Sequence, residues 1–140
     1  MACNSTKAFM AHMDELNSPV KLIVEDEEGD VLGTSYKTEH ISLKLLISIS
    51  DDKYLSIHGR DYIKVPMSKL REIINLCNKL NNEYRWVKFV CDEEKCSVIL
   101  KADHIINPET AVDYITEIMD CMMDISDEAY PEFMKVIWAA

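Results

Sequence analysis

Residues 41–50, ISLKLLISIS, constrain the fold of this chain more than any other segment. Every second residue is a large aliphatic one, and all but one of the residues between them are polar. A period of two is typical of a β-strand that buries one face and exposes the other. The segment therefore predicts a strand in a sheet that packs on a core with one face only.

The neighbouring segments continue this pattern. Residues 26–37, DEEGDVLGTSYK, indicate a turn and a strand, and residues 54–58, YLSIH, indicate a returning strand. In that register Leu55 opposes Ile49 and Ile57 opposes Ile47 on the apolar face. Residues 20–65 thus predict a meander of three antiparallel strands.

Helical spacing marks the rest of the chain. Residues 5–16 carry apolar side chains about one turn apart, and residues 70–80 repeat them at i, i+3, i+4, i+7 and i+10. Asn107 suits an N-cap and Pro108 suits the first helical position, so a long helix is expected after them. A last short helix is expected to begin near Pro131.

Two further strands surround the hexapeptide CDEEKC. A four-residue loop at residues 92–95 predicts a hairpin in which Cys91 faces Cys96. The same register puts one apolar row on the inner face: Val87, Phe89, Val98 and Leu100. Two cysteines alone do not make a zinc site, and no second ligand pair is visible, so neither a metal nor a cofactor is expected. A reversible disulfide between Cys91 and Cys96 stays open as an alternative.

The elements follow the order helix, three strands, helix, two strands, helix. Because no segment is repetitive or linker-like, residues 1–140 are expected to form a single domain. The predicted fold class is α+β, with an antiparallel meander sheet of about five strands and packed helices.

Composition restricts the class of partner. The 140 residues have a formal net charge of −10 and no sequence cluster of four basic residues, so neither nucleic acid nor an anionic membrane surface is an expected partner. No apolar run is long enough to span a membrane, and five scattered cysteines fit free thiols in a reducing compartment. The expected location is the cytoplasm.

Two sets of residues are candidates for a protein interface. Large apolar side chains fall on the predicted outer face of the sheet: Leu46, Trp86 and Ile99. They indicate a protein interface unless a helix covers that face. Carboxylates recur along one face of the long helix: Asp113, Glu117, Asp120, Asp124 and Asp127. Such a row is most often a solvated face, and the alternative is a docking ridge for a basic segment of a partner or a second subunit.

No catalytic motif is visible. The chain has no G-x-S-x-G, no glycine-rich phosphate loop and no nucleophile beside a recognisable base. We therefore expect a protein that is not an enzyme. The alternative is a small-molecule sensor or an enzyme whose site lies between the helices and the sheet.

Three segments resemble the YbjN-like family, bacterial proteins described as sensory transduction regulators. They are KVPMSKLREIINLCNKLN, WVKFVCDEEKCSVILKAD and DEAYPEFMKVIW, which are similar to the family's Val-Pro and following helix, its strand–turn–strand and its closing Ala-Tyr-Pro motif. The resemblance implies a fold similar to type III secretion chaperones, which are small, acidic and typically dimeric. It implies no catalytic residue. The leading prediction is a protein-binding chaperone-like or regulatory adaptor that forms a homodimer.

Overall fold

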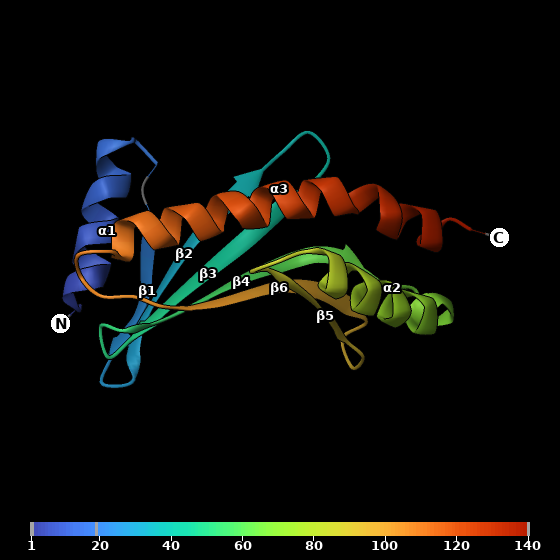
Figure 1. Cartoon of the computed structure of the whole chain (residues 1–140), viewed down its shortest axis with the longest axis horizontal. Coiled ribbons are helices and arrows are strands. Elements are labelled where there is room, and N and C mark those ends of the chain that lie inside the picture. The colour runs from blue at the N-terminus through green and yellow to red at the C-terminus, as the bar shows by residue number, and fades with distance from the viewer. Residues whose placement is uncertain (1, 19, 140) are drawn as a thin grey trace.

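The computed structural model describes residues 2–18 and 20–139 (Figure 1). Within these residues the chain forms three α-helices, one 3-10 turn (η1) and six strands, in this order: α1 (Asn4–Glu15), β1 (Lys21–Asp26), β2 (Gly29–Lys37), β3 (Ser42–Ser50), β4 (Tyr54–Lys64), η1 (Met67–Lys69), α2 (Leu70–Glu83), β5 (Lys88–Asp92), β6 (Ser97–Ile105) and α3 (Ala111–Ile137).

The six strands form one antiparallel sheet in the order β1-β2-β3-β4-β6-β5. The predicted α+β class is confirmed, and so is the pairing of Ile47 with Ile57 and of Ile49 with Leu55. The sheet has one strand more than expected, because β1 does not alternate cleanly. Its pairing with β2 shifts between Leu22 and Val24, and both Ile23 and Val24 are exposed. Such an irregularity removes the period-two signal.

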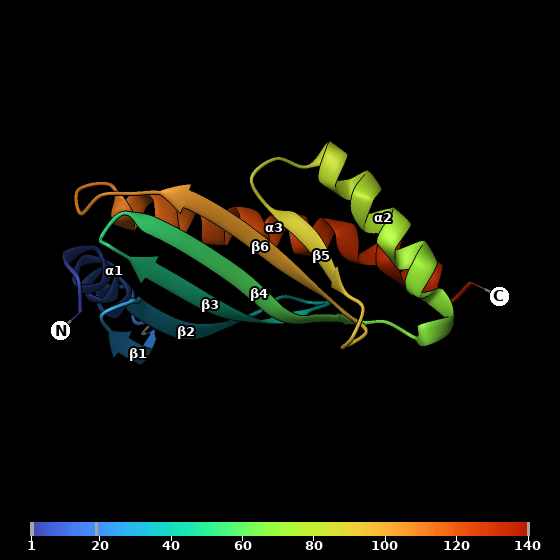
Figure 2. The same cartoon turned by 90° about the horizontal axis from the view of Figure 1, so that it is seen from below.

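The helices are distributed unequally around the sheet. Helices α1 and α3 lie over one face, and α2 lies beside the edge strand β5 (Figure 1). Seen from the other side, the strands face the viewer, and no helix of the described chain crosses them (Figure 2). One face of the sheet is therefore inward and the other open.

The core fills the space between α3 and the inward face. Ile115, Met119 and Met122 of α3 are at most 1% exposed. Gly59 of β4 lies beneath this helix, and a Cβ there would come within 3.0 Å of the Met122 sulfur. The absence of a side chain at Gly59 lets α3 approach the sheet closely.

Helix α3 is continuous through Pro131, so the prediction of a separate last helix is wrong. Proline lacks the N–H group that a helix interior uses. The apolar stripe nevertheless continues past it, because Ala129 and Phe133 are fully buried. Their burial outweighs the one hydrogen bond that Pro131 does not donate.

The predicted register of the last hairpin is also wrong. Cys91 pairs with Val98, and Cys96 lies in the turn with a φ of +49°. The Asp92 carboxylate accepts hydrogen bonds from the backbone N–H groups of Glu94 and Lys95, at 3.0 and 3.1 Å, and so starts the turn one residue later than expected. The register shifts by two residues, so the paired residues of β5 and β6 keep their predicted faces, whereas Cys96 leaves the predicted inward row.

Two aspartates, one from β2 and one from the turn between β3 and β4, hold the N-terminus of α1. Asp30, buried, accepts hydrogen bonds from the Cys3 N–H at 3.0 Å and the Thr6 hydroxyl at 2.7 Å. Asp52 accepts one from the Ser5 N–H at 2.8 Å. Burial alone would raise the pKa of each carboxyl, but these hydrogen bonds outweigh it, and both pKa values lie below the ordinary range.

Candidate protein-binding surfaces

The open face of the sheet carries apolar side chains with no helix over them. Ile105 is 61% exposed, Ile23 53% and Tyr54 48%. Leu46 and Ile99 also lie on this face and are half-buried among their neighbours. We call this surface the open face. The prediction that Leu46 and Ile99 point away from the core agrees with their position.

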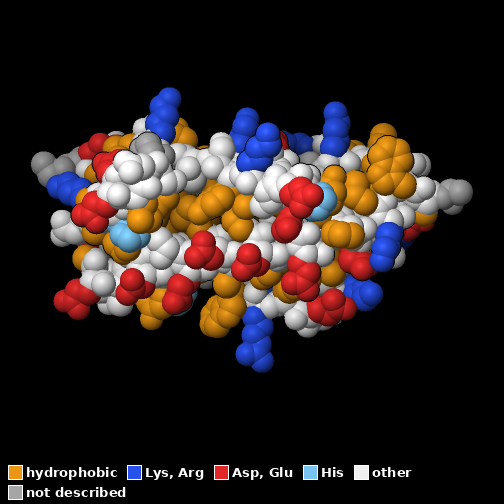
Figure 3. Space-filling view, turned by 90° about the horizontal axis from the view of Figure 1, so that it is seen from above, with side chains coloured by type: hydrophobic (Ala, Val, Ile, Leu, Met, Phe, Trp, Pro, Cys, Tyr) orange, Lys and Arg blue, Asp and Glu red, His pale blue; other side chains and the backbone are white. Residues whose placement is uncertain are grey.

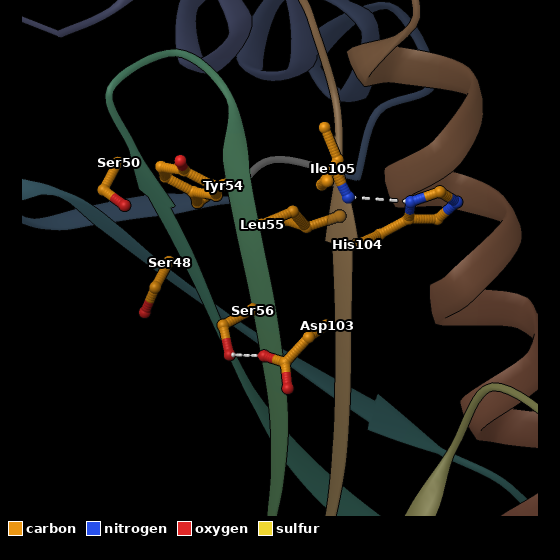
Figure 4. A pocket seen from close by; sticks show the side chains of 8 residues that line it. All are labelled: Ser48, Ser50, Tyr54, Leu55, Ser56, Asp103, His104 and Ile105. Atoms are coloured by element: carbon orange, nitrogen blue, oxygen red, sulfur yellow. Dashed lines mark hydrogen bonds between the residues drawn. The ribbon is translucent and has the colours of Figure 1, made fainter.

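One end of the open face is hollowed into a shallow depression of about 360 Å³ between β3, β4 and β6. The hydroxyl groups of Ser48, Ser50 and Ser56 lie along its strands (Figure 4). The Ser56 hydroxyl donates to the Asp103 carboxylate at 2.5 Å. His104 turns toward α3 (Figure 4), and because the Ser56 hydroxyl contacts Asp103 directly, no imidazole lies between this serine and this aspartate. The arrangement offers hydrogen-bonding groups to a partner and lacks the relay of a serine hydrolase.

Charges of both signs lie on the open face. His58 pairs with Lys101 across the strands, and Arg60 follows two residues later on the same strand face. Burial lowers the pKa of His58, and the positive charges of Lys101 and Arg60 lower it further. Asp103 provides a negative charge on the neighbouring strand. Two pairs of cations also face each other across the strands of this amphipathic face, Lys44 with Arg60 and Lys88 with Lys101.

The opposite side of the molecule carries the acidic ridge, which comprises Asp113, Glu117, Asp120 and Asp124 of α3. All four are exposed, and they form a line of carboxylates with apolar surface on both sides (Figure 3). Asp127, predicted to share this row, is half-buried and accepts a hydrogen bond from the Thr38 hydroxyl at 2.9 Å. No cation of the described chain lies within 4 Å of a carboxylate of the ridge.

Trp86 does not lie on the open face with Ile99. It precedes β5 and stacks on His104, with ring centroids 6.1 Å apart and an angle of 9° between the planes. His104 in turn contacts Tyr114 of α3 at 4.5 Å. These three rings, with Glu117, Ile118 and Cys121, line a groove of about 320 Å³ that we call the aromatic groove. The structure thus brings Trp86 together with a carboxylate of the acidic ridge.

Sequence reasoning missed His104 and Tyr114. They lie 18 and 28 positions from Trp86, on different elements, and only the packing of α3 on β6 unites them. The period of β6 alone indicates that His104 points inward, because it follows Leu100 and Ala102 on the same face. No sequence signal places Tyr114 beside it.

A reversible disulfide between Cys91 and Cys96 stays a prediction, although the structure does not have the register from which it was predicted. Both are free thiols, and Cys96 does not face Cys91 across the strands. Burial raises the pKa of the Cys91 thiol, and the nearby acidic groups Glu93, Cys96 and Asp92 raise it further. A raised pKa lowers the thiolate fraction and so slows disulfide exchange.

The space between α3 and the centre of the sheet is packed, whereas a hollow of about 300 Å³ lies between α1, α3 and β2, with Met13, Tyr36 and Met119 in its lining. Leu45, Ile57 and Leu100 are fully buried beneath α3. The two larger depressions, at the open face and beside Trp86, lie at the surface, where a protein segment can reach them. Among residues 2–18 and 20–139, no three His, Cys, Asp or Glu side chains are grouped so as to hold a metal ion. None of the described helices is long and apolar enough to cross a membrane.

Comparison with solved structures supports the fold. The chain is similar to a chain in the crystal structure of the ExsC-ExsE complex, with a TM-score of 0.60 and 16% sequence identity over 100% of both chains. At this identity the likeness shows the fold alone, and it confirms the predicted type III secretion chaperone-like α+β fold. None of the curated proteins gives a significant match.

Comparison with protein-family models identifies the family. Residues 9–135 match the model of YbjN, described as "Putative bacterial sensory transduction regulator". This span includes all six strands, α2, and nearly all of α3. The chain therefore belongs to the YbjN family.

Proposed function

We propose that this protein is a non-enzymatic, cytoplasmic protein-binding domain of chaperone-like or regulatory kind, and that two copies pair through the open face. The carrying observation is that the described helices leave one face of the sheet uncovered while that face holds exposed Ile23, Tyr54 and Ile105. Nucleic acid and membrane are not partners in this proposal. The YbjN assignment and the chaperone-like fold support the protein-binding role.

The size of the open face supports a stable interface. The six strands hold 49 residues, and at about 3.3 Å along the strand and about 4.8 Å between strands for each residue they cover roughly 780 Å². Stable complexes bury about 800 Å² per partner. The open face is therefore large enough for one standard interface and is not large enough for several.

One group of opposite charges on the open face supports pairing with a second copy of the chain. A two-fold interface presents the same surface from both sides, so the surface must complement itself. Lys101 and Arg60 lie near Asp103, and a two-fold axis can bring the cations of one copy to the aspartate of the other. A face of one sign would repel its copy.

Sedimentation velocity over a range of concentrations tests this proposal. The wild-type chain is expected to form a dimer, and the double variant Leu46→Asp/Ile99→Asp is expected to be a monomer because it buries two carboxylates in the interface. The matched control is Asn78→Asp, which adds the same kind of charge on the exposed side of α2. Circular dichroism checks that each variant folds. A monomeric wild-type chain, or a dimer that survives the double substitution, contradicts the pairing through the open face.

A further inference from the structure

The aromatic groove offers an exposed π face beside a carboxylate. Trp86 is 65% exposed although its ring stacks on His104. His104 is held in place from below, because its Nδ1 accepts the Ile105 N–H at 2.8 Å. Tyr114 continues the row of rings toward α3, and Glu117 lies one helical turn further on. The groove is thus lined by three rings that support one another and by an acid.

The backbone holds Trp86 outside the core. Val87, its neighbour, is fully buried, whereas Trp86 has a φ of +71°, and the Val87 N–H donates to the Arg85 carbonyl at 2.8 Å. This is a γ-turn of the rare positive-φ kind, which a bulky residue seldom adopts. The turn thus leaves the large indole ring in solvent, whereas Phe89 of the same segment is buried.

Carboxylates gather beside the groove. Glu117 lines it, and Asp120 and Asp124 follow on the same ridge of α3. Burial raises the pKa of the Cys121 thiol in the groove, and Asp124, Asp120 and Glu117 raise it further, which places all three carboxylates near this wall. No described cation within 4 Å neutralises them.

We propose that the aromatic groove binds an arginine side chain from a basic segment of a partner protein. A guanidinium group is planar, stacks on an aromatic face and presents paired N–H donors to a carboxylate. Trp86 supplies the face and Glu117 the carboxylate, while the rest of the acidic ridge meets further basic residues of the segment. Lysine satisfies only the charge, so arginine is the preferred occupant. The proposal rests on the proposed function and deepens it by naming the chemistry of the bound segment.

Titration of the full chain with a blocked alanine-based peptide that contains two arginines tests this site. The two tryptophan indole N–H signals in an NMR spectrum give an internal control, because Trp138 is exposed outside the groove. The arginine peptide is expected to shift the Trp86 signal and not that of Trp138. The same peptide with lysine is expected to bind about threefold more weakly, and with uncharged citrulline about tenfold or more weakly.

Variants assign the effect to the groove, with binding followed at the backbone amides of α3. Trp86→Ala is expected to weaken binding of the arginine peptide about tenfold, whereas Trp86→Phe, which keeps a ring, weakens it about threefold. Glu117→Gln is expected to weaken binding about fivefold. Asp113→Asn removes the same charge from the part of the ridge that does not line the groove and is expected to have a smaller effect than Glu117→Gln. Both tryptophan variants are expected to fold normally because the indole is mostly exposed.

Three results would overturn the arginine site. They are equal binding of the arginine, lysine and citrulline peptides, undiminished binding by Trp86→Ala, and equal losses from Glu117→Gln and Asp113→Asn. Each outcome is independent of sedimentation, so the groove can fail while pairing through the open face stands. Conversely, a monomeric chain that binds the arginine peptide at Trp86 contradicts the pairing and supports the groove.

Discussion

The two faces of the sheet are built from the same strands, but they differ in how deeply their side chains are buried. Along β3, Leu45 and Ile47 point inward and are fully buried, whereas Leu46 and Ser48 point outward and keep part of their surface exposed. The inward residues contribute the burial that stabilises the fold. The outward residues contribute little to it, so they can serve partner binding without changing the fold.

The largest expected effect on the free energy of unfolding comes from a residue on the inward side of the sheet. Phe133 is fully buried, with ring centroids 5.4 Å from Phe89 and 5.6 Å from Tyr62. Phe133→Ala is expected to lower the free energy of unfolding by about 3–5 kcal/mol because it leaves a cavity. Ile105→Ala on the open face is expected to change it by less than about 0.5 kcal/mol. Urea unfolding measures both, and losses of similar size would contradict the comparison.

Removing one hydroxyl oxygen from a buried and from an exposed tyrosine tests the same comparison between the two faces. The hydroxyl of Tyr62, buried, donates to the Ser126 carbonyl at 2.6 Å, and burial raises its pKa above the usual range. Tyr62→Phe is expected to lower the free energy of unfolding by about 1–2 kcal/mol, because a buried carbonyl loses its donor. Tyr54→Phe, on the open face, is the matched control and is expected to have no measurable effect. A loss at Tyr54 as large as that at Tyr62 would mean that the open face is buried in the isolated chain.

Acid is expected to weaken the attachment of α1. The pKa values of Asp30 and Asp52 are lowered in the folded chain, so their stabilisation is complete above the unfolded pKa of about 4 and is lost as the pH falls through the folded values. Asp30→Asn and Asp52→Asn are each expected to flatten the fall in stability below about pH 4. Unfolding midpoints measured across this range check the sign. A pH dependence equal to that of the wild-type chain in both variants would show that these carboxyls keep ordinary pKa values.

The smallest expected changes in the free energy of unfolding are those at the two hairpin cysteines, and they have opposite signs. Cys96 has a φ of +49°, which favours glycine, while Cys91 sits on the inward face of β5. Cys96→Gly is expected to raise the free energy of unfolding by up to about 1 kcal/mol, and Cys91→Gly to lower it by about 1 kcal/mol or more. Changes of the same sign would contradict the observed register.

Sequence patterns predicted the inward face well. The alternation in residues 41–50 and the pairing of Leu55 and Ile57 follow from burial on one side, which leaves a strong periodic signal. The stripe of α2 is equally regular: Ile73, Cys77 and Leu80 are all buried. Burial repeats with the period of the backbone, so one sequence is enough to detect it.

The remaining features depend on interactions of single residues, which leave no periodic pattern in the sequence. Strand β1 was missed because of its irregular pairing, the hairpin register because the Asp92 side chain starts the turn, and the end of α3 because burial of Phe133 overrides Pro131. The aromatic groove joins three elements, and its residues share no sequence pattern. The acidic ridge was visible in the sequence, but its position beside Trp86 was not.

The central claim is that the open face becomes buried in an assembly while the isolated chain leaves it exposed. Isoleucine methyl NMR with a soluble paramagnetic compound measures this directly, because Ile23, Ile99 and Ile105 report the open face and Ile47 and Ile57 the inward face. On raising the protein concentration, the paramagnetic broadening of the open-face methyl signals is expected to decrease toward that of the inward ones. Unchanged broadening of the open-face signals at every concentration, with protection elsewhere on the molecule, would contradict the account.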